Sequence, residues 1–145
     1  MCKICSKSTK NITIDSINYN FCSCCGFLSK TSEFIPSPSS EYNRYLQHNN
    51  SNNNDYVKYQ EKFYEEIKDY LGVNVLDYGC GDNHILSDII SSNGLNSFYY
   101  DLYFYPDENY KKHLYDAIIL EEVIEHLKDP KNVLSSLILL LNHKG

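Results

Sequence analysis

The amino-terminal part of the chain has a strand-like pattern of apolar and polar residues. In residues 12–21 apolar side chains recur at every second position, and the alternation changes phase at Asp15-Ser16. Alternation with a period of two is typical of strands, and a short polar pair between two such runs is typical of a turn. The pattern therefore predicts a β-hairpin.

After residue 55 the apolar positions change to a helical period. Most of them fall at steps of three and four, and they are Tyr56, Tyr59, Phe63, Ile67, Tyr70 and Leu71. This spacing predicts an amphipathic helix, with Asp55 capping its start and Gly72 ending it. Before this helix, residues 36–55 contain two prolines, several serines and a run of asparagine, which predicts a linker.

The rest of the chain alternates between strand and helix patterns. "VNVLD" is a short apolar run, "YGCGDN" a glycine-rich turn, "HILSDIISSN" a helical segment ended by Gly94, and "SFYYD" a second strand. A further buried strand is predicted over 115–120, and Pro130 stands at the start of a last helix. Strands that alternate with helices predict an α/β fold with a parallel sheet.

Charge and hydropathy narrow the class of protein. The 145-residue chain has a formal net charge of −6, which argues against a general nucleic-acid or membrane binder. The first residues contain no apolar signal-peptide region, and the run "LILLL" is far too short to span a bilayer. We therefore expect a soluble cytoplasmic protein that has neither a membrane partner nor a nucleic-acid partner.

Five of the six cysteines lie before residue 26, and four of them form two C-x2-C pairs. The pairs are Cys2 with Cys5 and Cys22 with Cys25, separated by sixteen residues, which is zinc-ribbon spacing. Two such turns can present four thiolates to one tetrahedral ion. We expect a structural Zn2+ in a module over residues 1–35, against the alternatives of disulfides or free thiols. Cys24 is an alternative to Cys25 as the fourth ligand.

The glycine-rich turn has the chemistry of a nucleoside site. Gly79 and Gly81 would let the backbone pass close to a ligand, and Asp101 ends the second strand about twenty positions later. In such units the carboxylate accepts hydrogen bonds from ribose hydroxyls. Asp82 would oppose a pyrophosphate, so a ligand without phosphates, such as S-adenosyl-L-methionine (SAM), fits better. The alternative is an ordinary strand-turn-helix corner.

Three segments carry a resemblance to a known family. "VLDYGCG", "YYD" and "YDAIILEEVIEHLKDP" together resemble class I SAM-dependent methyltransferases, and the amino-terminal module resembles that of a bacterial subgroup. The segment "YDLYFYP" over 100–106 is also similar to theirs, as is an RY-x-x-HNNS segment. The latter consists here of Arg44, Tyr45, His48, Asn49, Asn50 and Ser51.

The resemblance implies which residues meet the cofactor SAM. The expected set is Asp77, Tyr78, Gly79, Cys80, Gly81, Asp101, Leu102 and Glu122. Within this set, Asp77 and the two glycines would line the methionine end, with Tyr78 and Cys80 contributing backbone to the turn. Asp101 would hold the ribose hydroxyls, and Glu122 would lie near the sulfonium.

The resemblance also implies where catalysis would occur. Methyl transfer depends mainly on positioning a nucleophile against the methyl group, and a base helps when the nucleophile carries a proton. The candidates are His126 and Glu125, with His48 and Arg44 facing them from the linker. The alternative is that Glu125 and His126 only brace the loop after the strand, and that the other two are solvated linker residues.

The chain departs from the family pattern in its carboxyl-terminal part. We expect a Rossmann-like class I methyltransferase sheet that is incomplete over residues 56–145, with strands one, two and four. The third strand is short or absent, and strands five to seven would follow residue 145. An exposed sheet edge would then favour self-association or a complementing subunit. The methyl acceptor stays unknown, and the alternative function is a catalytically inactive interaction protein or a truncated remnant.

Overall fold

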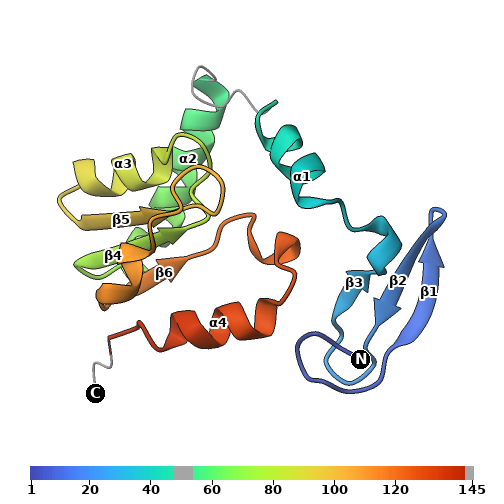
Figure 1. Cartoon of the computed structure of the whole chain (residues 1–145). Coiled ribbons are helices and arrows are strands. Elements are labelled where there is room, and N and C mark those ends of the chain that lie inside the picture. The colour runs from blue at the N-terminus through green and yellow to red at the C-terminus, as the bar shows by residue number, and fades with distance from the viewer. Residues whose placement is uncertain (48–53, 143–145) are drawn as a thin grey trace.

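The structure is a computed structural model that describes residues 1–47 and 54–142. It contains an amino-terminal antiparallel sheet and a separate parallel sheet covered by helices (Figure 1). His48, Asn49, Asn50 and Ser51 of the RY-x-x-HNNS segment lie outside the described residues. Within the described part, no helix is both long enough and apolar enough to cross a membrane.

The predicted hairpin is the centre of the amino-terminal sheet. Strands β1 (Lys10–Ile14) and β2 (Ile17–Phe21) pair antiparallel, and a short third strand, β3 (Leu28–Lys30), adds to β2. The turn residues Asp15 and Ser16 have φ angles of 49° and 65°. Positive φ at both central residues is the geometry that matches the twist of a two-residue hairpin. The hairpin prediction is therefore confirmed, whereas β3 was not predicted.

The segment between the two sheets contains a helix where the composition predicts a linker. After a single turn of 3-10 helix, η1 (Ser32–Phe34), helix α1 spans Pro38–Tyr45. The Ser37 hydroxyl accepts a hydrogen bond from the Ser40 amide, and Pro38 occupies the first helical position. A serine cap followed by proline favours helix initiation even in a polar segment.

The second sheet is parallel, with strand order β5-β4-β6. Its strands are β4 (Asn74–Tyr78), β5 (Asn96–Tyr100) and β6 (Ala117–Ile119). The helices that accompany it are α2 (Asn54–Ile67), α3 (Ile85–Ser92) and α4 (Pro130–Ile138). Short 3-10 turns complete the chain as η2 (Lys68–Tyr70), η3 (Glu108–Lys112) and η4 (Ile124–His126).

This architecture confirms the expected α/β fold with an incomplete Rossmann-like sheet. Among the described residues, the region between β5 and β6 holds η3 and no further strand. Figure 1 shows α2 and α3 on one side of the sheet and α4 on the other. Successive side chains of β4 point to opposite faces of the sheet. Val75 therefore packs with α2 and α3, and Leu76 packs with α4.

Three details of the predicted elements are corrected by the structure. Asp55 lies inside the first turn of α2 and not before it, and α2 ends at Ile67 with η2 following. Gly72 does not cap the helix. A Cβ atom there would lie 2.2 Å from the Cβ of Asp116, so the glycine allows a close approach of two segments. Strand β6 is also shorter than the predicted 115–120.

Candidate functional site

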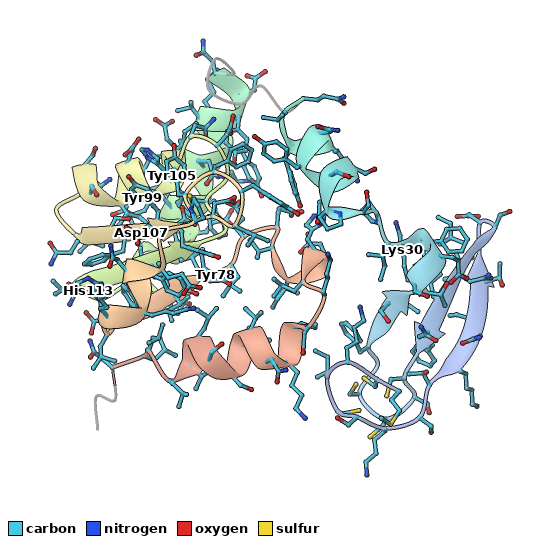
Figure 2. The ribbon with its side chains drawn as sticks, viewed as in Figure 1. Lys30, Tyr78, Tyr99, Tyr105, Asp107 and His113 are labelled. Atoms are coloured by element: carbon cyan, nitrogen blue, oxygen red, sulfur yellow. The ribbon has the colours of Figure 1, made fainter. Side chains whose placement is uncertain are left out.

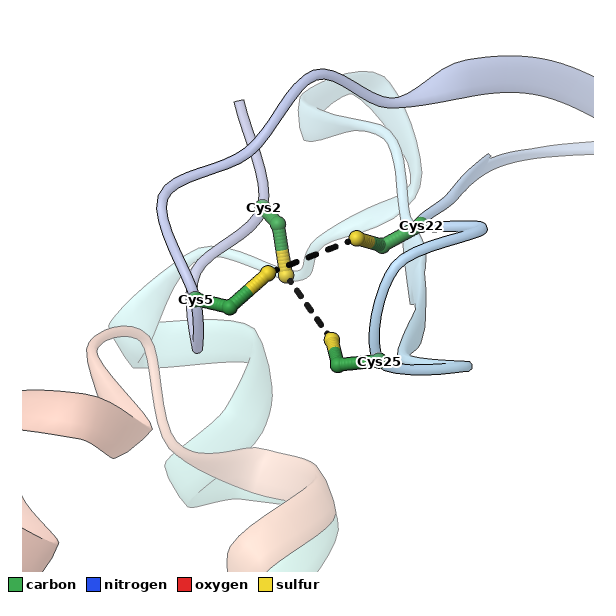
Figure 3. Close-up of side chains that lie close together, drawn as sticks. All are labelled: Cys2, Cys5, Cys22 and Cys25. Carbon is green, nitrogen blue, oxygen red and sulfur yellow. Dashed lines mark hydrogen bonds between the residues drawn. The ribbon is translucent and has the colours of Figure 1, made fainter.

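The four cysteines of the two C-x2-C pairs converge on one point (Figure 3). The Sγ atoms of Cys2, Cys5, Cys22 and Cys25 all lie within 4.8 Å of one another. Cys2 and Cys25 are separated by 3.6 Å between sulfurs, and Cys5 and Cys22 by 3.5 Å. A disulfide requires about 2.05 Å, so these are four free thiols in a cluster suited to a metal ion.

The backbone around the cysteine cluster stabilises the thiolate of Cys2. The amides of Cys5 and Ile4 donate to the Cys2 sulfur and lower the pKa of this thiol to about 6, although burial opposes the shift. A tetrahedral ion with metal–sulfur bonds of about 2.3 Å places its sulfurs about 3.8 Å apart, close to the distances observed. Cys24 is exposed and does not belong to the cluster, so Cys25 supplies the fourth sulfur.

The glycine-rich turn lies at the carboxyl ends of β4 and β5. Gly79 has a φ angle of 91°, and its amide donates a 2.7 Å hydrogen bond to the Tyr100 carbonyl. A Cβ atom on Gly79 would lie 2.4 Å from Cγ2 of Val123, a residue of the loop after β6. The turn therefore depends on glycine for its conformation and for the close approach of this loop.

Asp101 organises the end of β5. Its Oδ2 accepts a 3.1 Å hydrogen bond from the Gly81 amide, which ties the end of β5 to the glycine-rich turn. Its Oδ1 accepts from the amides of Tyr103 and Phe104, at 2.8 and 3.1 Å. The carboxylate is half-buried, and each oxygen retains capacity for a further donor.

A cavity of about 450 Å³ opens beside these two residues on the α4 side of the sheet. Tyr78, labelled in Figure 2, reaches this side and packs with Tyr100 at 5.0 Å between ring centroids. Seven of the sequence-predicted site residues line the cavity, and they are Tyr78, Gly79, Gly81, Asp101, Leu102, Glu122 and His126. The volume is in the range of small-molecule sites.

A second, smaller cavity of about 60 Å³ lies on the opposite side of the sheet, beneath α2. Asp77 faces it because alternate residues of β4 point to opposite faces. The Ser87 hydroxyl donates a 3.1 Å hydrogen bond to Asp77, and Gly79, Cys80 and Glu122 also line the space. The two cavities share Gly79 and Glu122, so they adjoin at the glycine-rich turn.

Burial changes the protonation of two side chains in the turn. Asp77 is only 4% exposed. Its burial raises its pKa to about 7, with a smaller contribution from the charges of Glu121 and Asp101 and a partly opposing hydrogen bond from Ser87. Burial raises the pKa of the Cys80 thiol, and the negative charges of Asp77 and Asp101 add to the effect. Among the described residues, no basic side chain lines the smaller cavity to offset the negative charge of this region.

The predicted catalytic pair lies in η4 at the mouth of the larger cavity. His126 lines that cavity and contacts the Tyr45 ring edge-on, with centroids 6.0 Å apart. Glu125 is exposed and lines neither cavity. It hydrogen-bonds Glu122 and thereby raises the pKa of that carboxyl. Arg44 is exposed on α1, and His48 lies outside the described residues.

Glu122 adopts a backbone conformation that is uncommon for its residue type. Its φ angle is 51°, in the left-handed region, at the point where the chain turns from β6 toward η4. This turn brings Val123 against Gly79, so the strained position sets the shape of the wall that both cavities share.

Several residues that line the cavities were given no role from the sequence, although Tyr45, Tyr103 and Phe104 lie within segments that resemble the family. Helix α1 contributes Glu41 and Tyr45, and the segment after β5 contributes Tyr103 and Phe104. These belong to regions where apolar periodicity is weak, so the pattern offered no signal. Gln60 in α2 did offer a signal, because it is a polar residue within the apolar face of the predicted helix.

Comparison with known proteins agrees with this geometry. A family model described as a methyltransferase domain matches residues 18–145, which includes most of β2, the second cysteine pair and both cavities. No curated protein and no solved structure matches the chain. The match covers most of the chain, and the β-α-β unit with its glycine turn fits the class I form of the fold. The chain therefore belongs to the methyltransferase domain family and is a class I member of it.

Proposed function

We propose that this chain binds SAM across the two adjoining cavities and supports methyl transfer to an acceptor at the mouth of the larger one. The observation that carries the proposal is the convergence of the expected cofactor residues. All eight of them line one or both cavities, and the cavities meet at Gly79 and Glu122. A ligand with an adenosine body and an amino-acid tail would fit this arrangement.

The chemistry of the larger cavity suits an adenosine. Aromatic rings at Tyr45, Tyr78, Tyr100 and Phe104 line its wall, and flat rings are favourable neighbours for a purine. Asp101 lies at the edge of the same cavity, held by three backbone amides. A carboxylate fixed in this way would accept hydrogen bonds from a pair of ribose hydroxyls.

The charge of the site suits a cation that carries no phosphates. Asp77, Asp101 and Glu122 surround the glycine-rich turn, and negative charge there would repel a pyrophosphate. Bound SAM supplies an electrophilic methyl group on a positively charged sulfonium. The absence of a Cβ at Gly79 leaves the backbone close to both cavities, as a bound tail would require.

The residues of η4 and α1 would act on the acceptor. His126 would accept the acceptor's proton, because it lines the mouth of the larger cavity next to Tyr45. Glu122 lines the same cavity and shares a hydrogen bond with Glu125, so this carboxyl pair would lie beside the acceptor. Glu125 would act indirectly, through Glu122, since it lines neither cavity.

We also propose that the cysteine cluster holds a structural Zn2+. The four residues that would bind it are Cys2, Cys5, Cys22 and Cys25, and all four ligand positions are protein sulfurs. A closed set of four ligands is typical of structural sites and leaves no position for a substrate. The small hairpin has almost no buried apolar core of its own, so the metal would supply most of its stability.

Calorimetric titration with S-adenosylhomocysteine (SAH), the demethylated product, tests the cofactor proposal. Binding of zinc-loaded chain in the micromolar range, about −8 kcal/mol, is the expected result. The variant Asp101→Asn removes the carboxylate charge and should weaken SAH at least tenfold. Asp107→Asn is the matched control, because this carboxylate caps η3 outside the larger cavity. Equal affinity of both variants would contradict the assignment of Asp101.

A further inference from the structure

The smaller cavity contains two buried oxygen atoms that have no hydrogen-bond partner. They are Oε1 of Gln60 and Oε1 of Glu121, and both residues line the cavity. Gln60 is only 2% exposed, although it is a polar residue on the packed face of α2. A buried acceptor without a donor is costly, so most such atoms in proteins are satisfied by a neighbour or a ligand.

The orientation of the Gln60 amide is fixed by its own donors. Its Nε2 donates to Oε2 of Glu121 at 2.8 Å and to the Tyr56 hydroxyl at 3.0 Å. Rotating the amide would replace the donor facing Glu121 with an oxygen, and two oxygens would then repel each other. The Oε1 atom of Gln60 is therefore held as an acceptor, as is the second oxygen of Glu121.

Charge around this cavity favours a cationic donor over a neutral one. Asp77 and Glu121 both line it, and burial together with the smaller effect of the Glu121 charge raises the pKa of Asp77. No lysine, arginine or histidine is among the described residues that line the space. A primary ammonium offers three N–H donors and a positive charge, whereas a water molecule would satisfy the oxygens but not the charge.

We propose that Gln60 and Glu121 form a binding site for a primary ammonium group. This inference rests on the proposed function, because it assigns the ammonium to the amino-acid tail of the cofactor and not to the acceptor. The cavity of about 60 Å³ is too small for a ring, and it adjoins the larger cavity at Gly79 and Glu122. An adenosine in the larger space would place its tail at this junction.

Three ligands and two variants test the site by calorimetry on the zinc-loaded chain. The ligands are SAH, its analogue with hydrogen in place of the α-amino group, and 5′-methylthioadenosine, which has no amino-acid tail. We expect the native chain to bind SAH at least tenfold more tightly than the other two. Gln60→Leu should weaken SAH about tenfold to hundredfold and leave the other two ligands within about twofold.

Gln47→Leu is the matched control, because Gln47 is the other glutamine of the chain and is exposed at the end of α1. It should leave all three affinities unchanged. Glu121→Gln keeps the shape of the site and removes its charge, and it should also reduce the preference for SAH over the amine-free analogue. This second variant decides the question if Gln60→Leu lowers the melting temperature too far for titration.

The outcomes separate this inference from the proposed function. If the native chain binds none of the three ligands, the cofactor assignment itself fails. If it binds SAH and the amine-free analogue equally, the adenosine site stands and the ammonium site is wrong. The site is equally overturned if Gln60→Leu weakens all three ligands to the same extent, since that result describes a structural role for Gln60.

Discussion

The Tyr103 hydroxyl donates a 2.7 Å hydrogen bond to the Glu41 carboxylate and so joins two segments that are sixty-two residues apart in the chain. Aromatic contacts join the same two segments, because the ring centroids of Tyr42 and Tyr45 in α1 lie 5.6 and 5.7 Å from that of Tyr103. Helix α1 lies outside the parallel sheet, yet through this contact it supplies one wall of the larger cavity. The cavity is therefore composed of parts from both halves of the chain.

Removing this hydroxyl should weaken ligand binding without unfolding the sheet. Tyr103→Phe keeps the ring contacts and loses one hydrogen bond to a carboxylate, which is worth about 1.5 kcal/mol, so we expect SAH affinity to fall about tenfold. Calorimetry measures the change. Tyr70→Phe is the control, because Tyr70 is 83% exposed. A loss of affinity in both variants, or in neither, would show that the bond does not shape the cavity.

The cysteine cluster gives a prediction with a closely matched control. Cys22→Ser removes a buried ligand, and metal analysis of the purified variant should fall well below the native value of about one zinc per chain. Cys24→Ser changes an exposed cysteine outside the cluster and should retain the metal. Equal zinc content in both variants, or zinc missing from the native chain, would refute the assignment.

Asp77 should make the stability of the fold depend on pH. Its folded-state pKa of about 7 lies above the ordinary value of 3.8, so the folded chain holds a proton that the unfolded chain loses first. The free energy of unfolding should therefore fall as pH rises from about 4 to 7. Asp77→Asn removes this effect, and its stability advantage should grow by about 2 to 3 kcal/mol between pH 5 and pH 8.

Urea unfolding in zinc-containing buffer at the two pH values measures this difference. Asp69→Asn serves as the control, because Asp69 is exposed in η2, and its unfolding curve should follow that of the native chain at both pH values. An advantage of Asp77→Asn that stays constant with pH would mean that the carboxyl is ionised throughout.

The two glycines of the turn should differ in their tolerance of a methyl group. Gly79→Ala would bring a Cβ atom to 2.4 Å from the Val123 side chain, in addition to backbone strain at a φ angle of 91°. We expect a loss of about 2 to 4 kcal/mol of stability and no measurable SAH binding. Gly81→Ala has open space and only the strain of a φ angle of 74°, so it should cost about 1 kcal/mol. Thermal and urea unfolding compare the two variants.

The elements that the sequence predicted well are those that local chemistry determines. The hairpin follows from alternation and from two turn residues that accept positive φ, and α3 follows from a short apolar helix ended by Gly94. The cysteine cluster was predictable because spacing alone brings two C-x2-C turns within reach of one ion. Asp15-Ser16 and Gly94 are examples in which one or two residues carry the signal.

The parts that were not predicted depend on contacts between distant segments. Helix α1 was missed because its residues are mostly polar, and its tyrosines contact a segment beyond β5 that is distant in the sequence. Gly72 was interpreted as a helix end, although its role depends on Asp116, which lies in another part of the chain. Which cavity a residue lines likewise depends on the folded sheet, because residues that are neighbours in a strand point to opposite faces of it.

Because neighbouring residues of β4 face different cavities, the length of this strand cannot change by a single residue without consequence. Asp77 and Tyr78 follow each other in β4, one facing the small acidic cavity and the other the large aromatic one. Inserting or deleting one residue within β4 would exchange their directions and place a ring where a carboxylate belongs. Substitutions in β4 can be tested one at a time, but a gain or loss of a single codon there would disrupt both cavities together.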